Sequence, residues 1–255
     1  MNASLTPEEI LRWHIAAGAD EAIGETAIDR YAAPAKQPVV FREDRPSLPI
    51  VPTPPVLDGA HPALACRTLA ELKDALFAYE GCALKKTCRQ TVFADGNPES
   101  GVMLVGEAPG ADEDRVGLPF VGASGRLLDR MLASIGLDRN ACYITNLVPW
   151  RPPGNRKPEQ TEIELCLPFL IRHIELVAPR FLLLLGGAPT QALLGRHDAI
   201  SRLRGHWHDC VLPQEEKIVP ALPTFHPAYL LRTPAHKRLA WADFLALRKR
   251  LDGAA

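Results

Sequence analysis

The sequence predicts an α/β protein, a three-layer α/β/α sandwich around a central and mostly parallel sheet. Two observations lead to this prediction. Short apolar runs of the kind that form buried strands recur at residues 102–105, 140–148, 181–185 and 219–225. Segments with the apolar spacing of helices separate these runs, and strands that alternate with helices form a parallel sheet covered on both faces.

Length and composition are those of an ordinary globular protein. The 255 residues suffice for one full α/β core with some chain left over, and the net charge is −1. Bulk charge therefore neither favours nor excludes nucleic acid, and no apolar run reaches the ~20 residues of a membrane span. No secretory signal is visible, so we expect a cytoplasmic protein, and a monomer. The six cysteines do not form a disulfide scaffold and raise the question of a metal site.

The chain divides into three regions. Residues 1–33 predict a short helical segment, because Thr6 and Pro7 make a plausible helix start. Residues 34–63 hold eight prolines and predict an extended linker. Residues 64–255 form the main domain. We expect the first segment to dock on that domain; a partner-binding helix and a proline-rich docking peptide are the alternatives.

The main domain begins with a helix at residues 68–77. Thr68 followed by Glu71 is a capping box, and Leu72 and Leu76 lie on one face at helical spacing. The remaining elements in chain order are a strand and turn at residues 92–98, an acidic loop after the strand at 102–105, and helices at 124–132, 159–177, from 190, and 229–250 with a break near Pro234.

Polar side chains follow three of the predicted strands. Glu107, Asn146 and His226 each stand at or just beyond the end of an apolar run. The carboxyl ends of parallel strands meet at one edge of a sheet, which is where open α/β sheets bind ligands. We therefore expect these three side chains to converge, although they are far apart in the sequence.

The loop after the first of these strands has an unusual composition. Four acidic residues lie within residues 107–114, and Phe120 stands between a proline and a glycine-bearing turn. A ring in this position is poorly placed to be buried and well placed to present its face to a ligand. The alternative is a solvated acidic loop with one aromatic side chain packed beneath it.

Three stretches, in order, resemble the motifs of the family 4 uracil-DNA glycosylases. They are GEAPGADEDRVGLPFVGASG at residues 106–125, ITNLVPWRPPGNR at residues 144–156 and FHPAYLLR at residues 225–232. The resemblance covers residues 81–251. It implies the three-layer fold and an enzyme that flips uracil out of DNA, hydrolyses its N-glycosidic bond and leaves an abasic site. Its partner would be uracil-containing DNA.

The resemblance gives catalytic roles to the three side chains at the strand ends. Asn146 would read the uracil edge, since an amide offers both donors and an acceptor. His226 would donate to uracil O2 as negative charge develops there, and Glu107 would hold the attacking water. A turn or cap role for Asn146 and a structural role for His226 are the alternatives.

Other residues of the motifs are expected to line the uracil pocket. Phe120 would stack on the flipped base, with core packing as the alternative. Glu113 would crowd the C5 edge of uracil and help to exclude thymine. Gly106 and Ala108 belong to the same motif, and Asn155 matches a second asparagine near the pocket or the DNA backbone.

We expect arginines on nearby loops to contact the DNA backbone, which would make binding salt-dependent. In the superfamily, the segment beside the catalytic histidine wedges into the gap that the flipped base leaves. The candidates are Arg151, Arg156, Arg204 and Arg232 for the backbone and Tyr229, Leu230 and Leu231 for the wedge. Solvated surface arginines without a role are the alternative.

The chain departs from the family at the metal site. Most family 4 members hold a four-iron, four-sulfur cluster through four cysteines, and Cys82 and Cys166 match the second and fourth of these. Tyr79 and Trp150 stand at the first and third positions and cannot supply thiolates. We therefore expect that the cluster is absent, that aromatic packing replaces it and that no cofactor is required. Cys88 is the alternative ligand.

Two other classes of function compete with this prediction. One is a non-catalytic uracil- or DNA-binding module of the same fold, and the presence of all three catalytic candidates argues against it. The other is an iron–sulfur redox protein, against which the missing cysteines argue. The loop at residues 152–158 is short and contains no histidine, unlike the loop of the covalent uracil-trapping relatives, so we expect turnover.

Overall fold

The structure is a computed structural model that describes residues 61–212 and 217–253, all within one compact unit of the chain. The predicted N-terminal helical segment and nearly all of the predicted proline-rich linker lie outside the described residues, and both stay predictions. The described chain begins with the 3-10 turn η1 (Pro62–Ala65), which starts on a proline. The last two residues of the predicted linker therefore belong to a helical turn.

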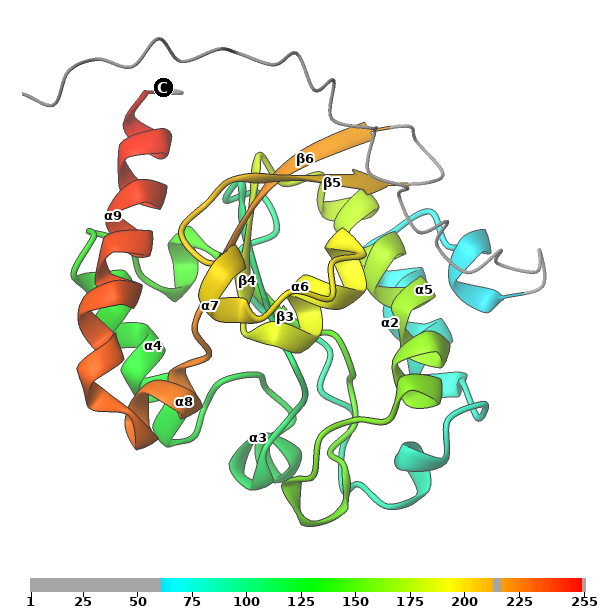
Figure 1. Ribbon diagram of the computed structural model, residues 1–255. Coiled ribbons are helices and arrows are strands. Elements are labelled where there is room, and N and C mark those ends of the chain that lie inside the picture. The colour runs from blue at the N-terminus through cyan, green and yellow to red at the C-terminus, as the bar shows by residue number, and fades with distance from the viewer. Residues whose placement is uncertain (1–60, 213–216, 254–255) are drawn as a thin grey trace, which may run out of the picture. The chain divides into compact units, whose positions relative to one another are not determined.

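Within the described residues, a six-stranded sheet forms the centre of the fold (Figure 1). Its strand order is β1-β3-β2-β4-β6-β5; the four middle strands run parallel, and each edge strand is antiparallel to its neighbour. The prediction of a mostly parallel sheet is confirmed. The strands are β1 (Asp95–Gly96), β2 (Val102–Gly106), β3 (Tyr143–Asn146), β4 (Phe181–Leu185), β5 (His208–Leu212) and β6 (Lys217–Thr224).

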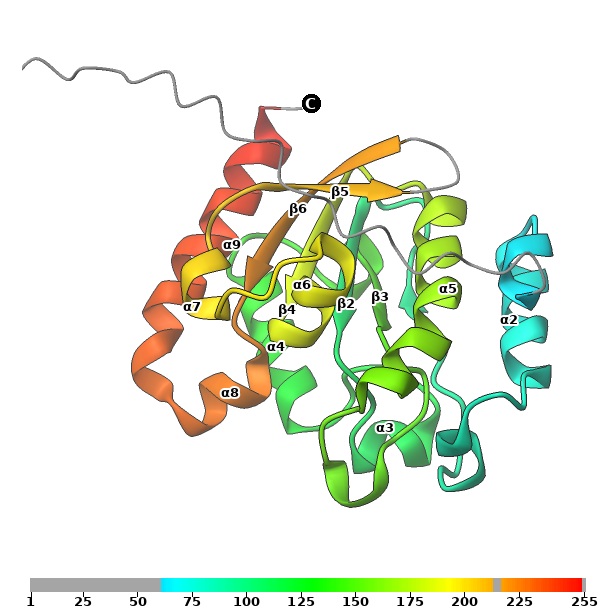
Figure 2. The ribbon, with the colours of Figure 1, turned by 45° about the vertical axis from the view of Figure 1, so that its right-hand side comes forward.

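Helices cover both faces of this sheet. They are α2 (Leu69–Ala78), α3 (Ala111–Val116), α4 (Ala123–Ala133), α5 (Gln160–Val177), α6 (Gly187–Leu194), α7 (Ile200–Leu203), α8 (Pro227–Arg232) and α9 (Lys237–Asp252). Figures 1 and 2 show α2 and α5 on one face and α4 and α9 on the other. Neighbouring side chains of β2 enter the two layers in turn: Met103 packs in the core of the α5 face and Leu104 in that of the α4 face. The predicted three-layer sandwich is confirmed.

The pairing register brings the strand ends level with one another. β2 and β3 pair Gly106 with Asn146, and β4 and β6 pair Leu185 with Thr224. Because these strands are parallel, the residues that follow them share one edge of the sheet. This edge carries the candidate site.

The first predicted helix of the main domain begins at its predicted cap. Thr68 Oγ1 accepts the Glu71 N–H at 3.2 Å, which is one half of the predicted capping box. The Glu71 carboxylate accepts the Arg67 N–H at 2.6 Å instead of the N–H of Thr68. No helix in the described part of the chain is long and apolar enough to cross a membrane.

Several elements differ from the prediction. The predicted strand at residues 140–148 is limited to β3, α7 is not among the predicted helices, and two further differences have a local cause. The short helix α3 forms where the sequence predicts an acidic loop, because the Glu113 carboxylate accepts the Gly110 N–H at 3.1 Å and caps the first turn. The edge strand β5 is missing from the prediction. Its sequence HDCVL lacks a continuous apolar run, since only Cys210 and Leu212 of the strand are buried.

Candidate active site

β2 and β3 continue to pair beyond their last residues. The Leu147 N–H donates to the Gly106 carbonyl at 2.9 Å, and the Val148 N–H donates to the Glu107 carbonyl at 3.0 Å. Glu107 is therefore held by its backbone against the neighbouring strand, although it lies outside the regular sheet. This arrangement fixes the start of the loop that carries the first motif.

The side chains of Asn146 and Phe120 meet over Gly106. A Cβ atom at position 106 would overlap Asn146 Oδ1 and would lie 2.6 Å from Phe120 Cζ. Only glycine lets both groups come this close to the backbone. Asn146 is 6% exposed, and no described residue hydrogen bonds its amide, so the donors and the acceptor of the amide remain available to a ligand.

Phe120 is buried, although the sequence places its ring where burial is not expected. It is 4% exposed and has a left-handed backbone, with a φ of 55°. Its ring lies 5.6 Å from the ring of His226, centroid to centroid, at a tilt of 31°. A Cβ atom on Gly125, in the first turn of α4, would overlap the Phe120 carbonyl. The helix therefore packs directly on the backbone that turns this ring into the site.

Arg139 holds the backbone of Phe120, and it is not among the residues predicted from the sequence. Its guanidinium donates to the carbonyls of Pro119 (3.1 Å) and Phe120. Two carboxylates anchor the guanidinium in turn, Asp95 at 2.5 Å and Asp129 at 2.9 Å. No local pattern marks this arginine, because its partners lie far away in the sequence and only the fold brings them together.

Glu113 joins the two ends of the same loop. Its carboxylate accepts the Gly110 N–H at 3.1 Å through one oxygen and the Gly122 N–H at 2.8 Å through the other. Gly122 is the residue that caps α4. The structure thus gives Glu113 a role in shaping the loop, while its predicted contact with the C5 edge of uracil stays a prediction.

His226 stands at the first turn of α8 with a defined tautomer. Its Nδ1 accepts the Ala228 N–H at 3.1 Å, so a neutral ring carries its proton on Nε2. Burial, with a smaller contribution from Arg232, lowers the pKa of the imidazole to about 4, which keeps it neutral at pH 7. Gly186 makes room for the ring: its φ is 103°, and an added Cβ would lie 3.1 Å from the His226 Cβ.

Arg204, a predicted DNA contact, is paired within the protein, and its contact with DNA stays a prediction. Its guanidinium pairs with the buried carboxylate of Asp243, with Nε 2.9 Å from Oδ2, and its side chain is 15% exposed. The same carboxylate accepts the Thr224 hydroxyl at 2.6 Å, at the end of β6. Arg204 therefore supports the strand that leads to His226 and is not available to a phosphate in this conformation.

Glu107 is half-buried and keeps its carboxylate free. Burial raises the pKa of the carboxyl above its usual value, and the nearby charge of Lys157 opposes this shift. No described residue hydrogen bonds the carboxylate, so it can hold a water. Ala108, which follows it, packs against the core on the α5 face of the sheet.

The loop after β3 binds its own polar residues. Arg151 Nε donates to Asn155 Oδ1 at 2.7 Å, and Asn155 is exposed, with a φ of 57° in the turn η4 (Pro153–Asn155). Arg156 makes two hydrogen bonds to Glu162, at 2.8 and 2.6 Å, so its guanidinium is already paired. Arg151 Nη1 also lies 3.8 Å from Oδ2 of the buried Asp114, so both arginines of this loop are held by partners within the protein.

The three wedge candidates in α8 differ in exposure. Leu230 is fully buried in this conformation, and its predicted contact with DNA stays a prediction. The Tyr229 hydroxyl bonds His236 Nδ1 at 2.8 Å. Leu231 is 44% exposed, and Arg232 beside it is exposed too. Leu231 is the one of the three that presents a free apolar side chain.

The four positions that correspond to the cluster ligands of the family lie together in the core. The Tyr79 ring stacks on Trp150 with centroids 6.3 Å apart, and Phe169 packs edge-on against Tyr79 at 5.1 Å. Burial, together with the neighbouring thiols of Cys166 and Cys82, raises the pKa of the Tyr79 hydroxyl. The two cysteines are free thiols joined by a hydrogen bond, which lowers the pKa of Cys82 to about 7.

This corner does not fit a cluster that needs four thiolates. Two of the four positions hold aromatic rings, which supply no ligand. Among the described residues, no three histidine, cysteine, aspartate or glutamate side chains stand close enough together to hold a metal ion. Cys88 bonds the carbonyl of Lys85 at 3.3 Å.

Known proteins are similar to this chain over the part that carries the site. The model of the uracil DNA glycosylase superfamily matches residues 93–245. A protein of Sulfurisphaera tokodaii named type-4 uracil-DNA glycosylase is 36% identical over 187 residues, which cover 71% of this chain and 84% of that protein. Proteins of the same name from Pyrobaculum aerophilum (39% identical; 66% and 86% covered) and Archaeoglobus fulgidus (38% identical; 69% and 90% covered) are similar as well.

Proposed function

This chain belongs to the uracil DNA glycosylase superfamily, and we propose that it excises uracil from DNA by hydrolysing the N-glycosidic bond, as in base excision repair. The observation that carries the proposal is that Asn146 and Phe120 meet over Gly106 and that the His226 ring lies 5.6 Å from the Phe120 ring. An aromatic ring, a free amide and a neutral imidazole are the groups that binding and cleavage of a flipped uracil require.

Recognition of the base is assigned to two side chains. Phe120 stacks on the flipped uracil, which contributes roughly 1–3 kcal/mol. Asn146 donates its NH₂ to uracil O4 and accepts the uracil N3–H through Oδ1. Cytosine carries an amino group in place of O4 and no proton on N3, so its binding would leave these polar groups facing like groups. The unpaired state of the Asn146 amide supports this role.

His226 is assigned to the anion that forms as the glycosidic bond breaks. Its Nε2–H donates to uracil O2, where negative charge develops. A donor that is already oriented toward developing charge contributes about 2.7–4 kcal/mol to lowering the barrier in comparable oxyanion sites. The pKa of about 4 supports a neutral donor that loses no proton during the step.

Glu107 is assigned to the water and the sugar. Its carboxylate orients the water that attacks the anomeric carbon, and it balances the positive charge of the sugar in the transition state. A free carboxylate on a backbone held by β3 supports this assignment. Glu113, Ala108 and Asn155 complete the proposed pocket, with Glu113 opposite the thymine methyl position.

Binding of the DNA backbone is assigned to side chains around this edge of the sheet. Arg151 and Arg232 contact phosphates, and Leu231 enters the gap left by the flipped base. Arg151, Arg156 and Arg204 are each paired within the protein, so each would have to exchange such a partner for a phosphate. We also propose that the protein acts in the cytoplasm. We further propose that it is a monomer, and light scattering of the purified protein would check its molar mass.

We further propose that catalysis needs no iron–sulfur cluster. Proteins of this family commonly hold one, but the stacked Tyr79 and Trp150 occupy two of the ligand positions. None of the catalytic assignments above involves Cys82 or Cys166. These two residues belong to the core beneath α5. Loss of a cluster from this core is compatible with an intact sheet edge.

The test is a glycosylase assay on a duplex with a single U·G pair, followed by alkali cleavage of the abasic product. Purified protein should release uracil without added metal or nucleotide and should leave a matched T·G duplex intact. An excess of folded protein that yields no abasic site would refute the proposed function. Release of thymine at the same rate would refute the role of Glu113.

A further inference from the structure

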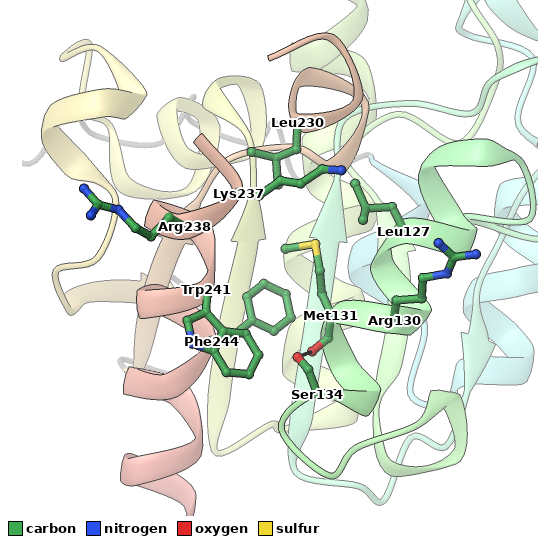
Figure 3. Close-up of a pocket in the computed structure, with 9 residues that line it drawn as sticks. All are labelled: Leu127, Arg130, Met131, Ser134, Leu230, Lys237, Arg238, Trp241 and Phe244. Carbon is green, nitrogen blue, oxygen red and sulfur yellow. Dashed lines mark hydrogen bonds between the residues drawn. The ribbon is translucent and has the colours of Figure 1, made fainter. Parts of the chain in front are cut away.

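A hollow of about 330 Å³ lies between α4, α8 and α9 (Figure 3). The fully buried Leu230 and Phe244 form part of its floor, Met131 projects into it, and Trp241 lies against Phe244 at its side. Trp241 is 41% exposed, although its ring is large and mostly apolar. The volume is at the lower end of the range for ligand sites, enough for one or two bulky side chains.

Three exposed cations surround this hollow. Arg130 of α4 and Arg238 of α9 point outward on opposite sides, and the Lys237 side chain extends toward Leu127 (Figure 3). Within the described residues, none of the three pairs with a carboxylate. The net charge of the whole chain is −1, so the positive rim is a local feature and does not follow from bulk composition.

We propose that this hollow is the docking site for an acidic peptide segment of a partner protein. The segment inserts one or two bulky apolar side chains between Met131 and Trp241 and sets its carboxylates against Arg130, Lys237 and Arg238. Exposed tryptophan and arginine are the residues that most often anchor protein interfaces. The charges on the rim give such a site its preference for an acidic partner. The inference adds a binding partner to the proposed function and does not depend on it.

The interior of the hollow favours an apolar side chain over a nucleobase. Ser134, an exposed residue that lines the hollow, already donates its hydroxyl to the Met131 carbonyl at 2.5 Å. A base would therefore lose the hydrogen bonds of its polar edge on entering, whereas a phenylalanine or leucine side chain loses none. The cations alone would suit a phosphate as well, so DNA is the competing occupant that the experiment must separate.

The experiment measures fluorescence anisotropy of a short labelled peptide in which aspartates flank a Phe-Leu pair, with the full-length protein. Trp241→Ala should weaken binding at least about tenfold, since it removes an anchor of the hollow. Arg238→Glu should weaken it about tenfold and reduce its salt dependence. Leu245→Ala and Lys249→Glu are the matched controls: each changes an exposed residue of the same helix outside the hollow, and each should bind as the wild type does.

Changes in the peptide give a second check. Asparagine in place of aspartate, or alanine in place of the Phe-Leu pair, should abolish the difference between wild type and variants. Wild-type protein that does not bind the peptide would overturn the proposal. So would variants that lose affinity for an oligonucleotide but not for the peptide, which would assign the hollow to DNA, or variants that abolish self-association, which would assign it to a second copy. Uracil release by the same samples, without peptide, reports separately on the proposed function.

Discussion

The sheet edge and the core around Tyr79, Cys82, Trp150 and Cys166, called the corner here, both correspond to family motifs. Only the sheet edge keeps all the residue types of those motifs. At the edge, Gly106, Asn146 and His226 are all present and meet around Phe120. In the corner, Cys82 and Cys166 remain, and aromatic rings take the other two positions. A group that acts on a substrate atom needs a particular donor or acceptor at a particular place. A group that only fills a core can be replaced by another of suitable shape.

We propose that packing of aromatic side chains replaces ligation of a cluster in the corner. Trp150 is fully buried, and Tyr79 stacks on it while Phe169 closes the side. Burial of a large aromatic side chain contributes on the order of 2–3 kcal/mol, so these rings together can match a sizeable part of what a structural cluster would add. The edge has no such substitute, because an apolar side chain can neither read uracil nor stabilise its anion.

Loss of the imidazole at the sheet edge should have the largest effect on catalysis. His226→Ala removes the Nε2–H donor, and we expect the single-turnover rate of uracil release to fall by roughly 10²–10³. Affinity for the uracil-containing duplex should change little, because the donor acts mainly in the transition state. His206→Ala, at an exposed histidine, is the control and should keep the wild-type rate. A His226→Ala protein as fast as the wild type would place the stabilisation of the anion elsewhere.

A single methyl group at the edge should have the next largest effect. Gly106→Ala places a Cβ against Asn146 Oδ1 and Phe120 Cζ, so both side chains must move. A displacement of about 1 Å in a positioned group can cost up to 10²-fold in rate, and we expect a loss between about tenfold and a hundredfold. Gly187→Ala is the matched control, because an added Cβ there meets no atom within 4 Å. Equal activity of the two variants would show that the contact at Gly106 is not needed.

Removal of the guanidinium behind Phe120 should have a smaller effect. Arg139→Met leaves the Phe120 carbonyl without its donor, so the left-handed turn loosens and the stacking face is no longer fixed. We expect the rate to fall about tenfold and inhibition by free uracil to weaken by a similar factor, in line with partial loss of stacking. Arg248→Met, which also breaks an ion pair with an aspartate, controls for lost surface charge.

The uracil inhibition constant separates positioning from stability in this variant. A merely destabilised protein would release uracil normally at low temperature and would bind free uracil as the wild type does. Arg139→Lys restores one charge but cannot span the carbonyls and both carboxylates, so it should recover only part of the activity. Full recovery would indicate that charge alone, rather than the fork of hydrogen bonds, holds the loop.

The parts of the fold that follow from local pattern could be predicted. The apolar runs of β2 and β4 are continuous because both faces of a central parallel strand are buried, so these two strands are confirmed within one residue. Only one face of the edge strand β5 is buried. The polar residues His208 and Asp209 interrupt its apolar pattern, so the sequence does not indicate a strand there. The acidic helix α3 depends on a cap by Glu113, and an acidic stretch without apolar spacing does not indicate a helix.

In the candidate site, too, some residues could be predicted from local pattern and others could not. Asn146 and His226 could be placed at one edge because strand ends in a parallel sheet share an edge. Their predicted roles stay predictions. Arg139 could not be found, because its partners are joined to it only by the fold. The burial of Leu230 and the ion pair of Arg204 likewise depend on helices that pack against them from elsewhere in the chain.

The smallest effect on activity is expected in the corner, where replacement of both cysteines should leave catalysis nearly intact. Cys82→Ser with Cys166→Ser keeps two small side chains that can still bond each other, while Tyr79 and Trp150 hold the surrounding core. We expect uracil release within about twofold of the wild type and a loss of roughly 1–3 kcal/mol in the free energy of unfolding, from burying hydroxyls in place of thiols. Cys210→Ser, at another buried cysteine, is the control for that cost. The decisive measurement is the iron content and visible absorbance of wild-type protein purified without oxygen. About four iron atoms per chain, lost together with activity in the double variant, would mean that Cys88 or another side chain completes the ligand set. The corner would then be a working cofactor site, and the contrast with the sheet edge would fail.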